Sequence, residues 1–546
     1  MRVALVKLYD DYCHGPRCLQ ADLLAQGHEA YLINLKPFHM GRRGFGAFDE
    51  NLLREIRETD AWVEVQYDGE VFLPEHIAIA ERETEIFLNL LAEIKPELIC
   101  FSVTSDDAEV SARHTQLVRE HFPGVPTVWG GVEISHEAPK YAKFADRMIR
   151  GEGEVPLRML AEDPWREDIP SLHWIDRSGA HHETPMAPLI QDCDSLAWPT
   201  YGVNEFLIHD RMLHRITVET HREYLAQRYI HMTGRGCPFK CTFCHHWKTH
   251  ELYAGDKYLR RRSPSAVVDQ LQWAQSTLGV QSVMFWDDVF LMNTRWIEAF
   301  ASEYQSRMRM PIGGLSFPTM TTERMIDALV DCPFVCVGFG IQSGSEFVVQ
   351  GIYNRGYFND KIKRIAWYCH ERGIEVTYDF LIHNPYESED DIRASLRLIL
   401  DMPVPYNIIT KRLYLYPNSP INALPHPRHS VDEKTWQHFA MLMHLARDPS
   451  VPREVIWDMA NNEYLKARPE IVTAFVKSCL SRHNASREDP AVTRMAELNA
   501  RKPMPQAEGT LGHRARGFLS RLVPAGRRRA STGASKMPAE NGLMAH

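Results

Sequence analysis

The chain has 546 residues, of which 44% are hydrophobic and 24% charged, and its formal net charge is −9. This length predicts several domains rather than one core, since a domain holds roughly 150 residues. The acidic balance argues against a general nucleic-acid binder, and no uncharged run approaches the about 18 residues that cross a membrane, so we expect neither nucleic acid nor a membrane as a partner.

The first residues read MRVALVKLYDDYCHG, with acidic residues where a secretory signal would be apolar. We therefore expect a first strand there and a cytoplasmic protein. In the cytoplasm thiols stay reduced, so clustered cysteines are more often metal ligands or catalytic groups than disulfides.

Residues 1–165 alternate strand-like and helix-like runs. Strands are predicted in RVALVKLY, HEAYLINLK, ELICFSV, PTVWGG and RMIRGEGE, and helices in CLQADLLAQG, in ETEIFLNLLAEI and in a run that ends near Phe122. This alternation predicts an α/β, doubly wound (Rossmann-like) domain around a parallel sheet, interrupted by an irregular span from Pro37 to about Pro74. Residues 166–225 are expected to form a connector with a hairpin around residues 177–180.

A second alternating series covers residues 226–425. Strands are predicted from Tyr229 onward and in SVMFWDD, GGLSF, FVCVGFGIQ, EVTYDFLI and NIITKRLYLY, and Ser263 with Pro264 indicates the start of an intervening helix. Five or six such units predict a partial (β/α)6 barrel of the TIM type, with its chemistry at the carboxyl ends of the strands. Residues 426–500 are predicted to be helical, and the arginine-rich residues 501–546 to be a disordered basic tail.

Three of the eleven cysteines, Cys237, Cys241 and Cys244, stand close together in HMTGRGCPFKCTFCHHWKTH. A loop that follows a strand with this spacing can ligate three irons of a [4Fe–4S] cluster and leave the fourth iron open. A structural zinc site with His245 or His246 as fourth ligand is the alternative, although no second half-site follows. The remaining cysteines, including Cys332 and Cys336, are read mostly as buried apolar side chains.

The loop resembles that of radical S-adenosylmethionine (SAM) enzymes, in which an aromatic residue, here Phe243, precedes the last cysteine. The resemblance implies that the three cysteines hold the cluster, that SAM binds the open iron, and that an electron donor such as flavodoxin or ferredoxin starts formation of a 5′-deoxyadenosyl radical. The implied SAM contacts are Phe243, Asp287, Asp288, Gln342 and Ser343. His383, in DFLIHNPYESEDD, is either a proton donor or a structural histidine, and no catalytic residue is assigned.

Turns follow three predicted strands of the first domain, in ICFSVTS, VWGGVEIS and GEGE, and the second and third of these turns carry glycines. Such turns let a backbone approach a flat ligand closely. A doubly wound domain with these turns, placed before a radical SAM barrel, resembles the cobalamin-binding domain of the cobalamin-dependent (class B) radical SAM enzymes. The cobalamin contacts that this resemblance implies are Ser102, Thr104, Gly130, Gly131, Gly151, Glu152 and Gly153.

The chain lacks the Asp-x-His-x-x-Gly loop whose histidine lies below cobalt in many cobalamin proteins. Residues 11–15 come nearest, with the wrong spacing. The absence of this loop implies a cobalt without a histidine beneath it.

The resemblance implies a methyltransferase that acts on carbon or phosphorus in a small specialised, antibiotic-type metabolite, and P-methylation of a phosphinothricin-type intermediate is one specific candidate. Three alternatives stay open: a cobalamin-dependent enzyme that closes, contracts or oxidises a ring, a radical SAM enzyme whose first domain no longer binds cobalamin, and an iron–sulfur or zinc protein without catalysis. Candidate substrate-lining segments are residues 37–74, residues 245–253 and the C-terminal helices.

Overall fold

The computed structural model describes residues 1–10, 12–36, 63–66, 69–72, 78–209, 211–225, 229–416, 418–426, 428–429 and 431–485. These residues all lie in one compact unit, Met1–Gly509. The predicted disordered tail and most of the irregular span from Pro37 to Pro74 lie outside the described residues.

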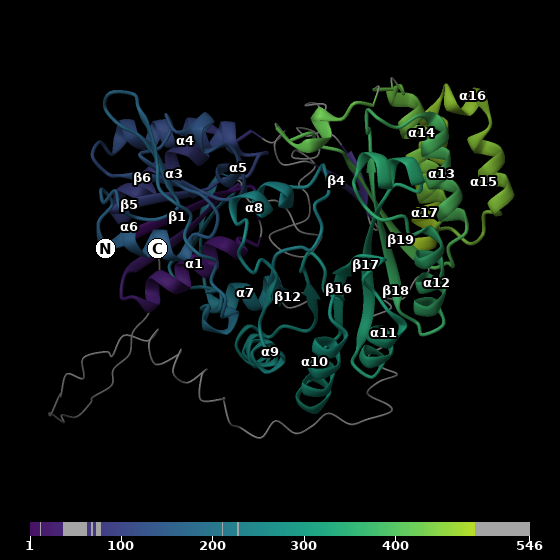
Figure 1. Cartoon of the computed structure of the whole chain (residues 1–546), viewed down its shortest axis with the longest axis horizontal. Helices are drawn as coiled ribbons and strands as arrows, with labels where there is room; N and C mark the ends of the chain where they lie inside the picture. The colour runs from purple at the N-terminus through teal and green to yellow at the C-terminus, as the bar shows by residue number, and fades with distance from the viewer. Residues whose placement is uncertain are drawn as a thin grey trace, which may run out of the picture. The chain divides into compact units, whose positions relative to one another are not determined.

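The first sheet has nine strands in the order β11-β10-β2-β1-β5-β6-β7-β8-β9 (Figure 1). Five of its parallel strands alternate with helices: β1 (Arg2–Leu8), β2 (Glu29–Leu35), β5 (Leu98–Ser102), β6 (Thr127–Gly130) and β7 (Arg147–Ile149). The helices between them are α1 (His14–Ala25), α3 (Glu81–Ile94), α4 (Ala108–His121), α5 (Val132–Tyr141) and α6 (Glu154–Glu162). The predicted doubly wound domain is confirmed.

Helices cover both faces of this sheet, and β1 shows why. Ala4 and Val6 pack with Phe87 of α3 on one face, whereas Leu5 packs with Leu160 of α6 on the other. A strand that is buried on both faces carries a nearly continuous apolar run, which is how RVALVKL reads.

The segment expected to be a connector supplies four strands at the edges of the first sheet. These are β8 (Leu172–Ile175) and β9 (His181–Glu183) at one edge, and β10 (Glu205–His209) and β11 (Met212–Ile216) at the other. Strands β8 and β9 are antiparallel, so the predicted hairpin around residues 177–180 is confirmed. Helix α7 (Val218–Leu225) follows β11.

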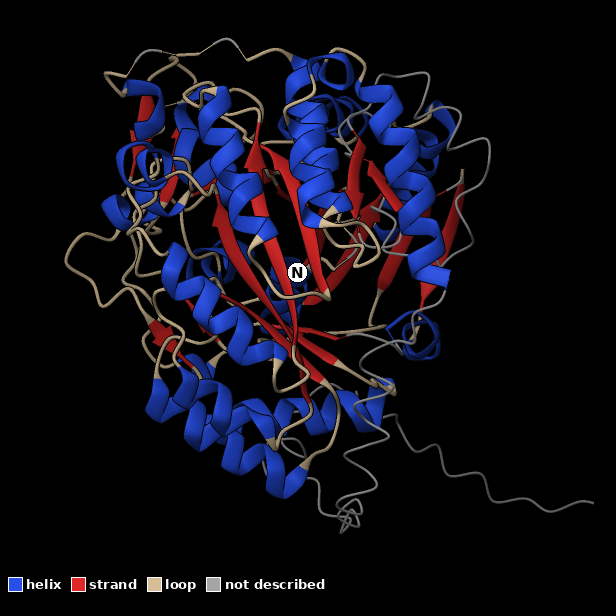
Figure 2. Cartoon of the chain, turned by 90° about the vertical axis from the view of Figure 1, so that its right-hand side faces the viewer, coloured by secondary structure: helices blue, strands red, loops and turns tan. Residues whose placement is uncertain are grey.

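The second sheet has six parallel strands that follow one another in chain order. They are β12 (Tyr229–His231), β15 (Val283–Phe285), β16 (Ile312–Ser316), β17 (Phe334–Gln342), β18 (Glu375–Ile382) and β19 (Tyr406–Arg412). The connecting helices are α9 (Pro264–Leu278), α10 (Thr294–Arg307), α11 (Glu323–Val330), α12 (Asn359–His370) and α13 (Glu389–Leu400). Figure 2 shows helices lying over the outer face of the strands, as the predicted partial barrel requires.

Local signals set several of these boundaries. Ser263 accepts a hydrogen bond from the backbone N–H of Ala266 at 3.2 Å, and Pro264 fills the first turn of α9, as predicted. Short elements complete this part of the chain: α8 (His246–Leu252), the pair β13 (Gly234–Arg235) and β14 (Arg260–Arg261), the hairpin β3 (Val63–Gln66) and β4 (Gly69–Phe72), and the turns Cys193–Ser195, Phe347–Ile352 and Pro420–Ala423.

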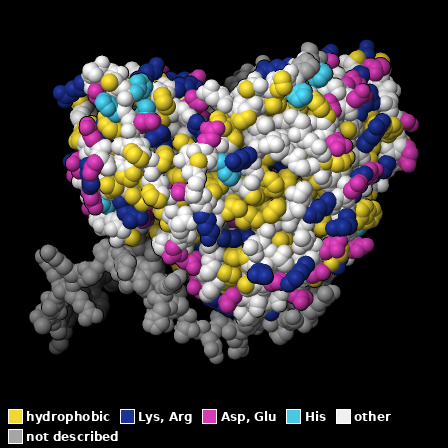
Figure 3. All heavy atoms as spheres, viewed as in Figure 1, with side chains coloured by type: hydrophobic (Ala, Val, Ile, Leu, Met, Phe, Trp, Pro, Cys, Tyr) yellow, Lys and Arg dark blue, Asp and Glu magenta, His cyan; other side chains and the backbone are white. Residues whose placement is uncertain are grey.

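The predicted helical region after the barrel consists of α14 (Glu433–Leu445), α15 (Arg453–Ala460), α16 (Glu463–Lys466) and α17 (Pro469–Ala485). Within the part of the chain that the structure describes, no helix is long and apolar enough to cross a membrane. In Figure 3, basic and acidic side chains are mixed over the visible face, so the net negative charge is not gathered in one area there.

Candidate functional site

The cysteine loop lies between β12 and α8, where the barrel begins. Thr242 donates a hydrogen bond to the carbonyl of Ile352 at 2.5 Å, and the ring of Phe243 meets that of Tyr353 edge-on at 4.7 Å. The loop is therefore fastened to the segment that follows β17. Phe243, predicted to contact SAM, packs in this apolar cluster together with Leu381 of β18.

One guanidinium lies among the three cysteines. Burial lowers the pKa of Arg355, and electrostatic interaction with Cys241, Cys237 and Cys244 opposes that shift, so all three cysteines lie near this group. Arg355 also donates to the carbonyl of Gly340 at 2.7 Å. The sequence analysis did not identify Arg355, because its place depends on how β17 and the cysteine loop meet.

The three thiols form a donor set that fits an iron–sulfur cluster. Burial raises the pKa of Cys237 and of Cys244 to about 12, so these thiols hold their protons until a cation displaces them. Soft thiolate ligands of this kind suit iron–sulfur clusters.

A second donor set overlaps the loop and corresponds to the zinc alternative. The ligand atoms of Cys244, His245 and His246 lie within 4.8 Å of one another. However, both nitrogens of His246 already face partners: Nε2 lies 2.9 Å from Oδ1 of Asp288, and Nδ1 lies 2.7 Å from the hydroxyl of Tyr258. Zinc would have to displace one of them.

The two aspartates after β15 have different surroundings. Asp287 is buried and accepts hydrogen bonds from the N–H and hydroxyl of Thr233, at 3.0 and 2.5 Å, and Arg261 lies 3.7 Å away. It therefore ties β15 to the segment that leads into the cysteines. Asp288 is partly exposed beside His246, so of the two it is the one with a carboxylate open to a ligand amino group.

The predicted SAM contacts at the end of β17 also differ. Ser343 is buried and donates to the carboxyl of Glu387 at 2.7 Å. Gln342 is partly exposed, has a positive φ of 70°, and stands at a register shift between β17 and β18. His383 lies 3.3 Å from Glu433 and near Trp436, beside the start of α14, which favours the structural reading of this histidine.

A cavity of about 300 Å³ opens at the carboxyl edge of the first sheet. Among its lining residues are Ser102, Gly130, Gly131, Gly151, Glu152 and Gly153, which were predicted as cobalamin contacts. Thr104, the seventh, is not among them: its N–H donates to Asp107 at 2.8 Å and Lys7 donates to its hydroxyl at 3.4 Å. The other wall comes from Thr233, Gly234 and Arg235, the residues that lead into Cys237.

Two of the glycine turns admit no side chain. Gly131 has a φ of 106°, and a methyl group there would collide with the backbone of Val103. Gly151 has a φ of 76°, and a methyl group there would collide with the hydroxyl of Tyr253 from the barrel. The turn at Gly131 needs glycine to pack within its own sheet, and the turn at Gly151 needs it to meet the barrel.

The side chain of Glu152, at the cavity wall, links the first domain to the barrel through ion pairs. Its carboxylate accepts hydrogen bonds from Arg235 at 2.9 Å and Arg260 at 3.1 Å, and its own N–H donates to Tyr253 at 3.0 Å. Arg235 also pairs with Glu154. This ion-pair cluster holds the start of the cysteine loop against the cavity wall. Arg235 and Glu152 are more than 80 residues apart in the chain, so no local sequence pattern predicts that they meet.

The first turn of α1 forms another part of the cavity wall. His14 lines the cavity, and burial together with Arg235 and Arg262 lowers its pKa to about 4, so it is neutral. It lies in the segment that the sequence analysis found nearest to the missing cobalt-binding motif.

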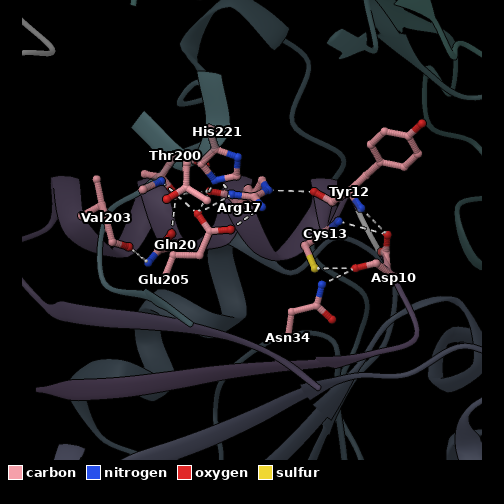
Figure 4. A network of polar contacts seen from close by, with 12 residues as sticks. Asp10, Tyr12, Cys13, Arg17, Gln20, Asn34, Thr200, Val203, Glu205 and His221 are labelled. Atoms are coloured by element: carbon pink, nitrogen blue, oxygen red, sulfur yellow. Dashed lines mark hydrogen bonds and ion pairs between the residues drawn. The ribbon is translucent and has the colours of Figure 1, made fainter. Parts of the chain in front are cut away.

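A buried network holds α1 in place (Figure 4). Arg17 donates two hydrogen bonds to Glu205 of β10, at 2.5 and 2.9 Å, and Nε2 of His221 lies 2.7 Å from the same carboxylate. Burial alone would raise the pKa of Glu205, but the charges of Arg17 and His221 outweigh it and hold this pKa well below its usual range.

The model of the Radical SAM superfamily matches residues 232–399. The chain carries a radical SAM domain. The matched range begins just before the cysteine loop and ends within α13, so it covers the cysteines and most of the barrel. This domain type uses a [4Fe–4S] cluster and SAM, as predicted from the loop.

Relatives of known name agree with this assignment. The chain is 23% identical over 332 residues to an uncharacterized methyltransferase of Pyrococcus horikoshii, covering 58% of this chain and 67% of the relative. It is 21% identical over 329 residues to the anaerobic magnesium-protoporphyrin IX monomethyl ester cyclase of Rubrivivax gelatinosus, covering 57% and 55%. It is 20% identical over 423 residues to the cobalamin-dependent radical SAM methyltransferase TokK of Streptomyces tokunonensis, covering 74% and 58%. The chain thus spans little more than half the length of two of these relatives.

Solved structures share the fold. The radical SAM methyltransferase TsrM of Kitasatospora setae has a TM-score of 0.56 at 17% identity, covering 77% of this chain and 75% of its own. The cobalamin-dependent SAM radical enzyme OxsB has a TM-score of 0.57 at 12% identity, covering 95% and 78%. The predicted fold class and the resemblance to cobalamin-dependent radical SAM enzymes are confirmed.

Proposed function

We propose that this chain is a cobalamin-dependent radical SAM methyltransferase that acts on a small molecule. The observation that carries the proposal is the shared cavity, because its walls are the glycine turns of the first sheet and residues 233–235, which lead directly into the cysteine loop. A corrinoid held by these turns would be next to the cluster site. Two solved structures with bound cobalamin share this fold over 77% and 95% of the chain, which supports the proposal.

The residues that would hold the cofactors are the predicted ones whose side chains or backbone turns are open to a ligand or can bind iron. Cys237, Cys241 and Cys244 would hold the cluster, Asp288 would receive the amino group of SAM, and the glycine turns would receive cobalamin. When bound, the cluster and SAM supply a 5′-deoxyadenosyl radical, and cobalamin supplies the methyl group.

The chain's own side chains fix the relative positions of these sites. The ion pairs of Glu152 with Arg235 and Arg260 hold the start of the cysteine loop against the turn at residues 151–153. Arg355 places a positive charge among the three thiols, where cluster ligation adds negative charge. Asp287 fixes Thr233, a residue of the cavity wall.

The acceptor atom is proposed to be an unactivated carbon or a phosphorus centre of a specialised, antibiotic-type metabolite. P-methylation of a phosphinothricin-type intermediate remains the specific candidate, with flavodoxin or ferredoxin as electron donor. A ring-forming or oxidative reaction without methyl transfer is the second candidate, favoured by the similarity to the magnesium-protoporphyrin cyclase.

The deciding experiment is anaerobic turnover of the reconstituted protein with cobalamin, a strong reductant, candidate metabolites and SAM that carries a CD₃ group. Methyl transfer predicts a product that has gained the labelled methyl group, together with 5′-deoxyadenosine. A product without the label, with 5′-deoxyadenosine still formed, would assign the ring-forming reaction instead. Metal analysis that finds zinc and no iron would refute both.

A further inference from the structure

Strand β18 presents one face to the interior of the barrel. Its buried residue Tyr378 packs against Tyr406 of the neighbouring strand, with ring centroids 5.4 Å apart, and the charge of Cys369 on the outer helix α12 helps to raise its pKa. The alternate residues Thr377, Asp379 and Leu381 are partly exposed. Because strands flank β18 on both sides and helices cover its outer face, this exposure opens into the barrel interior.

The interior face of β18 lies near the cysteine loop. Leu381 packs in the cluster that contains Phe243. Asp379 pairs in register with Gly340, whose carbonyl accepts a hydrogen bond from Arg355, the guanidinium among the cysteines. Asp379 therefore lies one strand away from the residue whose carbonyl binds Arg355, and Arg355 lies near all three cysteines.

One oxygen of the Asp379 carboxylate is buried without a hydrogen bond. Among the residues that the structure describes, its Oδ1 atom has no hydrogen-bond partner, whereas the residue as a whole is partly exposed. Burial raises the pKa of Asp379, and the charge of Lys411 opposes that shift. A carboxylate with an unsatisfied buried oxygen is costly, and the rest of the residue is open to the interior, so a group that donates hydrogen bonds to it from there would be bound favourably.

Lys411 lies on the same face of the adjacent strand. Thr410 meets His444 of α14 at 3.2 Å on the outer side, so Lys411 belongs to the opposite side. It pairs in register with Leu381, which makes it a diagonal neighbour of Asp379. Lys411 is exposed, and its ammonium is available to an anion.

We propose that Asp379 and Lys411 bind the zwitterionic head of an amino-acid-type substrate inside the barrel. Asp379 receives the ammonium group and Lys411 the carboxylate. This inference deepens the proposed function, since it names the class of molecule that would accept the methyl group. Neither residue was singled out by the sequence, because the pair forms only when β18 and β19 align.

The test is a binding titration by saturation-transfer NMR on the reconstituted protein, without reductant and with saturating SAM, so that the methionyl site is filled. The probes are L-norvaline and its two halves, n-butylamine and pentanoate. Norvaline is expected to bind at least about tenfold more tightly than either half. Asp379→Asn and Lys411→Met are each expected to weaken norvaline binding by about tenfold or more. Asp360→Asn, an exposed change on α12, serves as the matched control and should leave binding unchanged.

Three results would overturn the proposal: no norvaline binding to the unsubstituted protein, norvaline binding that both variants retain, or loss of SAM binding in the variants. The last would assign the pair to the methionyl group of SAM. Lys411→Met changes an exposed side chain, so it provides a folded variant even if Asp379→Asn lowers stability. Because no turnover and no corrinoid are needed, failure of methyl transfer and failure of this site give separate signals.

Discussion

The two parallel sheets of this chain are built from the same strand–helix unit, yet they place their chemistry differently. In the first sheet the order reverses at β1, so β2 and β5 lie on opposite sides of it, and the cavity opens outside the strand ends. In the second sheet the order follows the chain, and β18 and β19 present side chains such as Asp379 and Lys411 to the barrel interior. The order of the strands therefore decides where a ligand can bind. It can bind at backbone turns beyond the strand ends, as in the first sheet, or at side chains inside a barrel, as in the second.

The cysteine loop is the part of the second sheet where a single change has the largest expected effect. Cys237→Ala should lower iron content and reduce 5′-deoxyadenosine formation by about 100-fold or more, because a cluster with two protein ligands is labile. Iron analysis and product chromatography measure both. Cys369→Ala removes a buried thiol on α12 and is the matched control. Full activity of Cys237→Ala would contradict the cluster assignment.

Strand β10, which lies between β11 and β2 in the first sheet, carries the next largest expected effect. Glu205→Gln leaves the buried Arg17 without its charged partner and should reduce the free energy of unfolding by about 3–5 kcal/mol at pH 7. The folded pKa of Glu205 is depressed, so its contribution is present above the unfolded value of about 4.3 and is lost as the pH falls through the folded value.

Urea unfolding at pH 7 and at pH 4 tests this effect, and the difference between the unsubstituted protein and the Gln variant should shrink at the lower pH. Glu97→Gln, which affects an exposed ion pair with Arg2, should cost less than about 1 kcal/mol. Equal costs for the two variants would show that the network in Figure 4 stabilises nothing beyond a surface pair.

The glycine turn after β6 tests whether backbone shape makes the cavity. Gly131→Ala places a methyl group against the backbone of Val103 at a positive φ and should cost about 1–3 kcal/mol. It should also weaken hydroxocobalamin binding in equilibrium dialysis, because the turn that lines the cavity must shift. Gly356→Ala, where a methyl group meets nothing within 4 Å, should change neither quantity. Unchanged cobalamin binding in Gly131→Ala would remove this turn from the binding site.

The smallest expected effect concerns a buried glutamate of the second sheet, and its sign is opposite to that of Glu205. Burial raises the pKa of Glu387 to about 8. From about pH 4.3 up to that value the unfolded chain releases a proton that the folded protein keeps, so the carboxyl destabilises the fold as pH rises. Glu387→Gln should therefore gain about 1–3 kcal/mol relative to the unsubstituted protein between pH 5 and pH 8.

Urea unfolding at these two pH values measures the change. Glu371→Gln on the protein surface should follow the unsubstituted protein at both. A pH profile of Glu387→Gln that runs parallel to that of the unsubstituted protein would show that Glu387 is ionised in the folded state.

The sequence by itself determined most elements of both sheets, and it indicated the three cysteines that are proposed to hold the cluster. Apolar runs such as RVALVKL and the spacing of Cys237, Cys241 and Cys244 are local patterns, and local patterns are what periodicity and motif spacing record. It also indicated the glycine turns, of which Gly131 and Gly151 require their conformation.

Only the tertiary structure decided which side chains meet across the two sheets. The carboxylate of Glu152, a predicted cobalamin contact, pairs with Arg235 and Arg260, and the hydroxyl of Ser343, a predicted SAM contact, donates to Glu387. Arg355 among the cysteines and Asp379 beside Lys411 depend on strand order and register, which bring together residues that no short window of sequence contains.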